Sequence, residues 1–313
     1  MSPIAPLSAT QERPKPGEGP GRYGPRVRIL VTNDDGIDAP GIHVLARHLH
    51  RAGHDVLVVA PSTDWSGAGA ALGSFRPDED LEVTRCGIPD APAIEAWALA
   101  GTPAMTVVAA NLGAFGPPPD VVVSGINAGL NTGRSVLHSG TVGAALTGQN
   151  FGMSGLAVST AAADVWQWDT AAEIAVEVLT LLAEAPPRSV LNLNVPARPR
   201  DQVAGVRWAR LAPFGAVRAA VTGASGDRLQ FALEATGYEP PPDTDQHLVQ
   251  AGYASLTTLV GVVEAWPPEG DDDDRVEIGE RLVPGAPLHR AHRVPDGSEH
   301  RTLRRPVLGD TPR

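Results

Sequence analysis

Two adjacent carboxylates, Asp34 and Asp35, follow a short apolar run and precede Gly36. Neighbouring carboxylates repel each other when both are charged, so one takes up a proton unless a cation lies between them. Carboxylate oxygens are the hard ligands that Mg²⁺, Mn²⁺ and Ca²⁺ prefer, and Gly36 permits a turn tight enough to bring both side chains to one ion. The alternative is a solvated turn in which the aspartates bond to nearby backbone amides.

Two more oxygen-bearing side chains follow predicted strands. Ser66 comes after the apolar run 55–61, and Asn127 comes after the run 120–123. Because ligands bind beyond the carboxyl ends of parallel strands, we expect these side chains at the same sheet edge as Asp34 and Asp35. Taken singly, Ser66 and Asn127 are more often loop residues that bond to their own backbone. Taken together, the four predict a divalent-cation site.

A glycine-rich segment follows Val123, with glycines at 125, 129 and 133, and leads to Ser139, Gly140 and Thr141 at the start of an alanine-rich helix. Free N–H groups and the helix dipole favour an anion at such a position. The alternative for Ser139 and Thr141 is simple helix capping. A cation site beside a phosphate cradle predicts metal-assisted phosphoryl transfer or phosphate-ester hydrolysis.

The segment that carries the aspartates begins a strand–helix–strand unit over 26–32, 42–49 and 55–61, which predicts a parallel sheet. Beyond residue 196, the segments 205–211 and 228–234 alternate in polarity and predict antiparallel pairing, with Gly223 and Gly226 in the turns. We therefore expect an α/β fold with a mainly parallel sheet and a hairpin extension. The other expected strands are 94–99, 120–123, 156–159, 190–195 and 254–259, and the other helices begin near 103, 139 and 169.

Composition and charge restrict the partners and the cellular compartment that we expect. The 313 residues carry a formal net charge of -11, which argues against nucleic acid as a partner. The single cysteine, Cys86, excludes an internal disulfide and favours a reducing compartment. The sequence has neither a signal-peptide pattern nor a bilayer-length apolar run, so we expect a cytoplasmic protein without a membrane partner. We expect a disordered leader over 1–24, one domain over 25–265 and a charged tail over 266–313.

Several of these motifs, in this order, resemble the SurE family of metal-dependent 5'/3'-nucleotidases. The resemblance covers about 27–260 and rests most on 123–133 with 139–142, together with Asn33-Asp34-Asp35-Gly36, Ser66-Gly67 and Gly101-Thr102-Pro103. It implies a Rossmann-like three-layer core whose hairpin extension, about 205–240, and C-terminal oligomerisation segment reach a neighbouring subunit of a homodimer or homotetramer.

For the site, the resemblance implies one divalent ion per subunit, Mg²⁺ or Mn²⁺, held by Asp34, Asp35, Ser66 and Asn127. Asp34 and Asp35 would be catalytic in the hydrolysis of a small phosphomonoester, a nucleoside 5'- or 3'-monophosphate. The substrate phosphate would lie near Asn33, Gly36, Asn131, Ser139, Gly140 and Thr141. The chain departs from the family pattern at Met105-Thr106, Arg134 and His138, none of them an expected metal ligand.

Several alternatives stay open. The same chemistry could act on another phosphorylated metabolite, or the chain could bind nucleotides without turnover. Asp34 could instead be a covalent phosphate acceptor, although such enzymes usually carry a second acid where this chain has Gly36. His138, beside the predicted cradle, is a candidate proton donor, and a structural, hydrogen-bonded histidine is the alternative.

Overall fold

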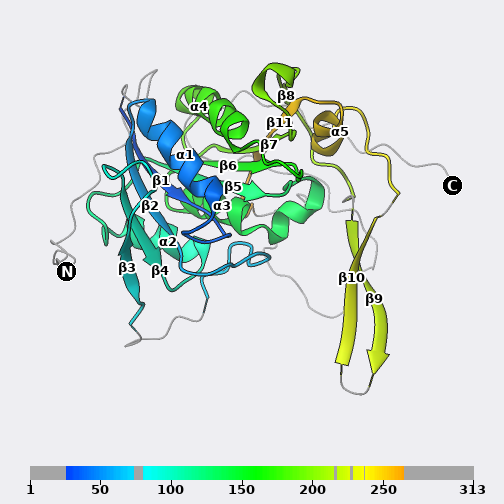
Figure 1. Cartoon of the computed structure of the whole chain (residues 1–313), viewed down its shortest axis with the longest axis horizontal. Helices are drawn as coiled ribbons and strands as arrows, with labels where there is room; N and C mark the ends of the chain where they lie inside the picture. The colour runs from blue at the N-terminus through cyan, green and yellow to red at the C-terminus, as the bar shows by residue number, and fades with distance from the viewer. Residues whose placement is uncertain (1–25, 74–79, 215–216, 226–227, 236, 264–313) are drawn as a thin grey trace, which may run out of the picture. The chain divides into compact units, whose positions relative to one another are not determined.

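The computed structural model describes residues 26–73, 80–214, 217–225, 228–235 and 237–263. Within that part of the chain, nine strands form one sheet in the order β3-β4-β2-β1-β5-β6-β7-β11-β8, and β9 and β10 form a separate pair (Figure 1). The strands are β1 (Arg28–Thr32), β2 (Asp55–Pro61), β3 (Val83–Cys86), β4 (Glu95–Leu99), β5 (Val121–Ala128), β6 (Ser154–Thr160), β7 (Val190–Val195), β8 (Val206–Trp208), β9 (Val217–Ser225), β10 (Arg228–Ala235) and β11 (Ala254–Leu259).

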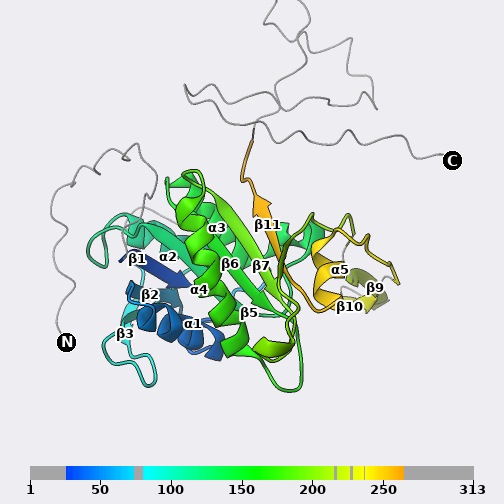
Figure 2. The ribbon, with the colours of Figure 1, turned by 90° about the horizontal axis from the view of Figure 1, so that it is seen from above.

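Helices cover both faces of this sheet. Helices α1 (Pro40–Arg51) and α4 (Trp168–Glu184) lie side by side on one face, and α2 (Pro103–Asn111) and α3 (Gly140–Asn150) cover the other (Figure 2). The short α5 (Asp245–Gln250) and two 3₁₀ helices, η1 (Gly133–His138) and η2 (Arg200–Gln202), complete the described elements. In α1 the helical spacing of Ile42, Leu45 and Leu49 makes one fully buried face. These layers confirm the predicted three-layer α/β fold.

The sheet is mainly parallel, as predicted. Only β3–β4 and β7–β11 pair antiparallel among the described pairs of the large sheet. Strand β1 lies between β2 and β5. After β1 the chain forms β2 on one side of it and later forms β5 on its other side. In open α/β sheets such a switch point opens a crevice beyond the strand ends. Asp34 follows β1 and Asn127 lies near the end of β5, so both belong to this switch point.

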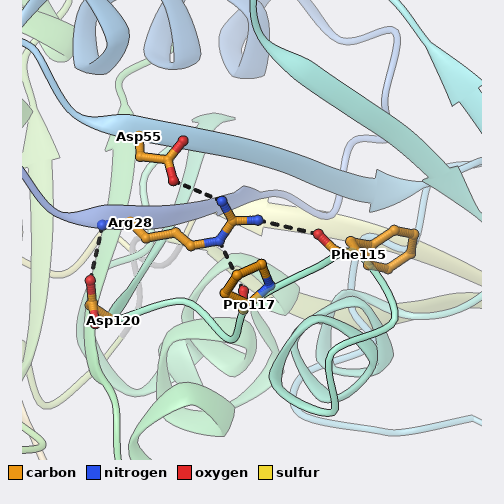
Figure 3. A network of polar contacts seen from close by, with 5 residues as sticks. All are labelled: Arg28, Asp55, Phe115, Pro117 and Asp120. Carbon is orange, nitrogen blue, oxygen red and sulfur yellow. Dashed lines mark hydrogen bonds and ion pairs between the residues drawn. The ribbon is translucent and has the colours of Figure 1, made fainter. Parts of the chain in front are cut away.

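The opposite end of β1 is fixed by Arg28 (Figure 3). Its guanidinium donates to Asp55 Oδ2 at 2.7 Å and to the carbonyl oxygens of Pro117 and Phe115 at 2.9 and 3.2 Å. The Arg28 amide donates to Asp120 Oδ2 at 3.0 Å. Because these contacts join β1 to the beginnings of β2 and β5, they set the register of the strands whose far ends carry the site.

Three details differ from the sequence-based expectation. The strand expected over 120–123 continues to Ala128, so Asn127 lies on the strand rather than in a loop. The segment 205–211 does not belong to the hairpin, because β8 pairs parallel with β11 in the large sheet. The hairpin is β9 with β10, and Gly223 lies within β9 opposite Gln230 instead of in a turn. Alternating polarity alone could not show which strand is the partner.

No helix among the described residues is long and apolar enough to cross a membrane. The leader expected over 1–24, the predicted turn residue Gly226 and the charged tail over 266–313 lie outside the described residues.

Candidate active site

Asp34 is buried at the end of β1, with 3% of its surface exposed. Its Oδ2 accepts the Gly140 amide at 3.0 Å and its Oδ1 accepts the Thr141 hydroxyl at 2.5 Å. The Asp34 carbonyl oxygen accepts the amide of Trp65 at 2.8 Å. Burial raises the pKa of Asp34, and the hydrogen bonds from Thr141 and Gly140 oppose the rise. The first turn of α3 therefore fixes the carboxylate that sequence analysis singled out.

The N-terminus of α3 already has internal partners. Ser139 is the N-cap, and its Oγ accepts the Val142 amide at 3.1 Å. A Cβ added to Gly140 would lie 2.6 Å from the Asp34 Cβ and 2.8 Å from Oδ2, so only glycine permits this approach. The sequence left two roles open for this turn, helix capping and anion binding. Ser139 caps the helix, and the carboxyl group that binds at the start of α3 is that of Asp34. That the substrate phosphate binds here too stays a prediction.

Asp35 is partly exposed beside Asp34. Desolvation raises its pKa to about 6, repulsion from Asp34 and Asp64 adds to the rise, and a hydrogen bond from the Ala128 amide opposes it. A carboxyl group with this pKa changes its charge close to neutral pH, so it can exchange a proton for a cation or accept one from water.

The raised pKa predicts a pH-dependent effect of Asp35→Asn in protein stripped of divalent ions. The folded pKa of about 6 exceeds the ordinary 3.8, so the folded state binds more protons between these values and stability falls as pH rises through this window. Because solvent screens this partly exposed carboxyl group, the effect is smaller than the full shift implies: we expect Asp35→Asn to raise the free energy of unfolding by about 1–2 kcal/mol at pH 7.5 and to leave it nearly unchanged at pH 4. Urea titrations at both pH values measure this difference, and an equal change at both would contradict it.

Ser66 lies in the loop after β2, and Asn127 lies near the end of β5. Ser66 is exposed, and both its Oγ and its amide donate to Asp64 Oδ1 at 2.7 Å. Asn127 Nδ2 donates to the Gly129 carbonyl at 2.8 Å, which directs Oδ1 away from that turn. The Ala128 amide next to Asn127 reaches Asp35, and the loop that carries Ser66 is joined to Asp34 through Trp65. The four predicted ligands thus lie on one sheet edge.

The Asp–Asp turn is held by Asn33. Its Nδ2 donates to the Gly36 carbonyl at 2.8 Å, and its Oδ1 accepts the Gly36 amide at 3.2 Å. Gly36 adopts a φ of +98°, a conformation that favours glycine. Both residues shape the turn that orients Asp34 and Asp35, and their predicted role in phosphate binding stays a prediction.

Asn131 is held by a network of buried amides. Its amide donates to Asn194 Oδ1 at 2.8 Å, and its carbonyl accepts Nδ2 of Asn192 and of Asn194 at 2.9 Å each. Its own Nδ2 donates to Ser159 Oγ at 2.9 Å. The loop between β5 and α3 is therefore fixed over the ends of β6 and β7. Contact between Asn131 and phosphate stays a prediction.

A buried carboxylate, Asp245, holds the next part of this loop. Asp245 Oδ2 accepts the Gly133 amide at 2.8 Å, and Oδ1 accepts the amides of Ala212 and Gln246 at 2.9 and 2.8 Å. Burial raises the pKa of Asp245 and the three amides oppose the rise. The first residue of α5 thus fixes the beginning of η1, which leads to Ser139.

Removal of this carboxylate should destabilise the fold. Asp245→Ala leaves buried amides of Gly133 and Ala212 without an acceptor, and we expect the free energy of unfolding to fall by about 3 kcal/mol. Asp201→Ala, at an exposed aspartate of η2, is the control and should cost less than about 0.5 kcal/mol. Urea denaturation measures both, and equal losses would show that Asp245 does not hold the loop.

Sequence reasoning missed Asp64, Asp245, Asn192 and Asn194. The two asparagines had a signal, because polar residues at alternate positions of an otherwise apolar strand predict a shared polar face. Asp64 lies two residues before Ser66, but a loop aspartate has no distinctive pattern. His138, the candidate proton donor, is exposed at the end of η1, and its carbonyl accepts the Gly69 amide at 3.1 Å.

The donor set fits a hard cation. Among the described residues, no three histidine, cysteine, aspartate or glutamate side chains form a group that could hold a metal. A site built on Asp34 and Asp35 therefore has two carboxylates and needs neutral oxygens, which Ser66, Asn127 and water can supply; Mg²⁺ and Mn²⁺ accept such a set, whereas zinc favours nitrogen and sulfur. Burial raises the pKa of Asp34 and of Asp35, and a cation bound between them would favour the charged form of both carboxylates.

Comparisons with known proteins place the chain in a family. The family model described as "Survival protein SurE" matches residues 29–216. The chain is 43% identical over 182 residues to a protein of Thermosynechococcus vestitus named 5'-nucleotidase SurE, covering 58% of this chain and 68% of that one. It is 38% identical over 240 residues to a protein of the same name from Xanthomonas campestris pv. campestris, covering 74% and 89%. The crystal structure of a SurE protein from Aquifex aeolicus matches with a TM-score of 0.63 at 30% identity, over 74% of this chain and 93% of that one.

Proposed function

The chain belongs to the SurE family, and on that premise we propose that it is a metal-dependent 5'-nucleotidase that hydrolyses nucleoside monophosphates to nucleoside and phosphate. The observation that carries the proposal is the pair Asp34 and Asp35 at the β1–β5 switch point, with Asp34 fixed by Gly140 and Thr141. Relatives that are 38–43% identical carry the name 5'-nucleotidase.

Asp34, Asp35, Ser66 and Asn127 would hold one Mg²⁺ or Mn²⁺ ion. When bound, such an ion supplies positive charge that polarises a phosphoryl group and acidifies water. Asp34, held rigidly by α3, would keep its charge and geometry through the reaction. Asp35, with a pKa of about 6 before an ion binds, is the residue whose carboxylate would orient the attacking water and accept its proton.

The substrate phosphate would lie at the open side of these carboxylates. The predicted surroundings are Asn33 and Gly36 in the turn after β1, Asn131 and Ser139 between β5 and α3, and Gly140 and Thr141 at the start of α3. His138 precedes Ser139 and is exposed, so it is available to a leaving oxygen. If His138 donates a proton to the leaving oxygen, the pH–rate profile of His138→Gln should lack one limb that the wild-type profile has.

The hairpin supports an oligomer. In β9 and β10, the side chains of Val221, Leu229 and Phe231 are 59%, 62% and 66% exposed. Exposed apolar residues gathered on one hairpin are typical of a subunit interface. We propose a homodimer or homotetramer in which this hairpin and the C-terminal segment contact a neighbour. The cytoplasmic location and the limits of the domain, 25–265, rest on the sequence alone.

Phosphate release from a panel of phosphomonoesters tests the substrate class. Release that requires Mg²⁺ or Mn²⁺ and prefers AMP, GMP or CMP over sugar phosphates supports the nucleotidase, and 3'-AMP shows whether both positions are hydrolysed. Release from a sugar phosphate alone would keep the chemistry and replace the substrate. Nucleotide binding by folded protein without release under any metal would support a non-catalytic binding protein.

A further inference from the structure

Two tryptophans stack on each other at the sheet edge that carries Asp34 and Asp35. The rings of Trp166 and Trp168 have centroids 4.8 Å apart and planes inclined by 10°. Trp168 is the first residue of α4, and the beginning of α4 lies beside the beginning of α1 at this edge (Figure 2). A Cβ added to Gly41 of α1 would lie 3.2 Å from Trp168 Cζ3. The stacked pair therefore lies at the start of α4, on the α1–α4 side of the sheet.

The turn at the end of β5 joins this pair to Asp35. The Cβ position of Gly41 that contacts Trp168 is also 2.2 Å from the Ile126 carbonyl oxygen. Two residues further on, the Ala128 amide bonds to Asp35. The next amide, of Gly129, donates to the Thr160 carbonyl at 3.0 Å, and the loop that bears Trp166 begins after Thr160. The turn 127–129 thus contacts Asp35 on one side and the base of the tryptophan loop on the other.

The two rings differ in how they are held. Trp168 packs against the main apolar core. Trp166 stacks on Trp168 and is partly exposed, and the neighbouring Val165 is 71% exposed. One face of the Trp166 indole is thus covered by Trp168, and this stacking orders the ring. A fixed, partly exposed indole is suited to a flat aromatic ligand, because stacking needs an ordered π surface.

We propose that Trp166, supported by Trp168, is the platform on which the base of a nucleoside monophosphate stacks while its phosphate lies at Asp34 and Asp35. The inference rests on the proposed function, since it assigns a place to the part of the substrate that the carboxylate site does not bind. Every base has a π face, so such a platform binds purines and pyrimidines with little discrimination. It therefore predicts a broad base specificity.

A third indole at this edge is the competing platform. Trp65 is 37% exposed next to Ser66, and its amide bonds to Asp34. Its loop contacts the α3 side of the sheet, because the Gly69 amide donates to the His138 carbonyl at 3.1 Å. Trp65 thus lies on the α3 side of the sheet and the stacked pair on the α1–α4 side. Single substitutions can therefore show which tryptophan is the platform.

The test compares a substrate that has a base with one that lacks it. For Trp166→Ala we expect the KM for AMP to rise about tenfold, within the range that stacking on an aromatic ring supplies, and the KM for ribose 5-phosphate to change less than about twofold. Trp166→Leu, which keeps an apolar side chain over Trp168, should show the same loss, and Trp166→Phe should restore most of the affinity. Trp208→Ala, at a 64% exposed tryptophan of β8, is the control.

Equal changes of the KM for AMP and for ribose 5-phosphate in Trp166→Ala would overturn the platform. So would a rise of the KM for AMP alone in Trp65→Ala, with no such rise in Trp166→Ala. Adenosine binding, followed by titration calorimetry, separates this inference from the proposed function because it needs no turnover. Wild-type protein that releases phosphate from neither compound would refute the nucleotidase. Adenosine affinity that falls about tenfold in Trp166→Leu would still support the platform, and unchanged affinity would refute it.

Discussion

Asp34→Asn is expected to reduce phosphate release from AMP by at least about 10³-fold. Loss of a single preorganised charge-stabilising group typically costs 10²–10³ in turnover, and Asp34 would in addition contact the divalent ion directly. Turnover measured at saturating Mn²⁺ gives the loss in the chemical step, and a Mn²⁺ titration gives the loss in metal affinity.

The variant should fold, which makes its activity informative. Asparagine Oδ1 can accept the Gly140 amide, and its Nδ2 can donate to the Thr141 hydroxyl, because a hydroxyl both donates and accepts. Burial already disfavours the charged form of Asp34, so a neutral replacement removes a desolvation cost. A melting temperature close to that of the wild type is the control. Full metal-dependent activity in this variant would remove Asp34 from the proposed site.

Gly140→Ala is expected to reduce turnover by about 100-fold although it changes no polar group. The new Cβ would lie 2.6 Å from Asp34 Cβ and 3.0 Å from Cγ, so the carboxylate or the start of α3 must shift. Small displacements of a catalytic group cost on the order of 10²-fold, and overpacking of a buried position costs about 1–3 kcal/mol of stability. Turnover and urea denaturation measure the two effects.

Gly87→Ala is the matched control for this substitution. No atom lies within 4 Å of a Cβ at Gly87, so the variant should retain activity and stability. Wild-type turnover in Gly140→Ala would show that the close approach of α3 to Asp34 is not needed.

Much of the fold could be predicted because local patterns determine it. The apolar run of β1, the buried stripe of α1 and the run of β2 specify a strand–helix–strand unit, and such a unit requires a parallel sheet. The sequence predicted a helix that begins near residue 103, and the structure confirms it: α2 begins at Pro103, and Thr102 Oγ1 accepts the Met105 amide at 3.1 Å. In such segments the local sequence alone specifies the secondary structure.

Other features depend on contacts between distant residues. The partner of β8 is β11, about 50 residues further along, and no local pattern encodes that pairing. Asp245 stabilises Gly133 across 112 positions. At the site, sequence placed Asp34 and the α3 N-terminus at the same edge, but only the structure shows that Gly140 and Thr141 bond to Asp34 itself. Helix capping and anion binding use the same residue types, so the sequence left these roles open.

The measurement that tests the proposed site most directly is phosphate release from AMP by chelator-treated protein as Mn²⁺ is added back, with bound Mn²⁺ followed by electron paramagnetic resonance in the same samples. We expect no release without metal, and a rate that rises in proportion to bound Mn²⁺ until one ion per chain is present. Release that persists in chelator, or Mn²⁺ bound at one per chain by folded protein without release, would contradict a metal-dependent nucleotidase.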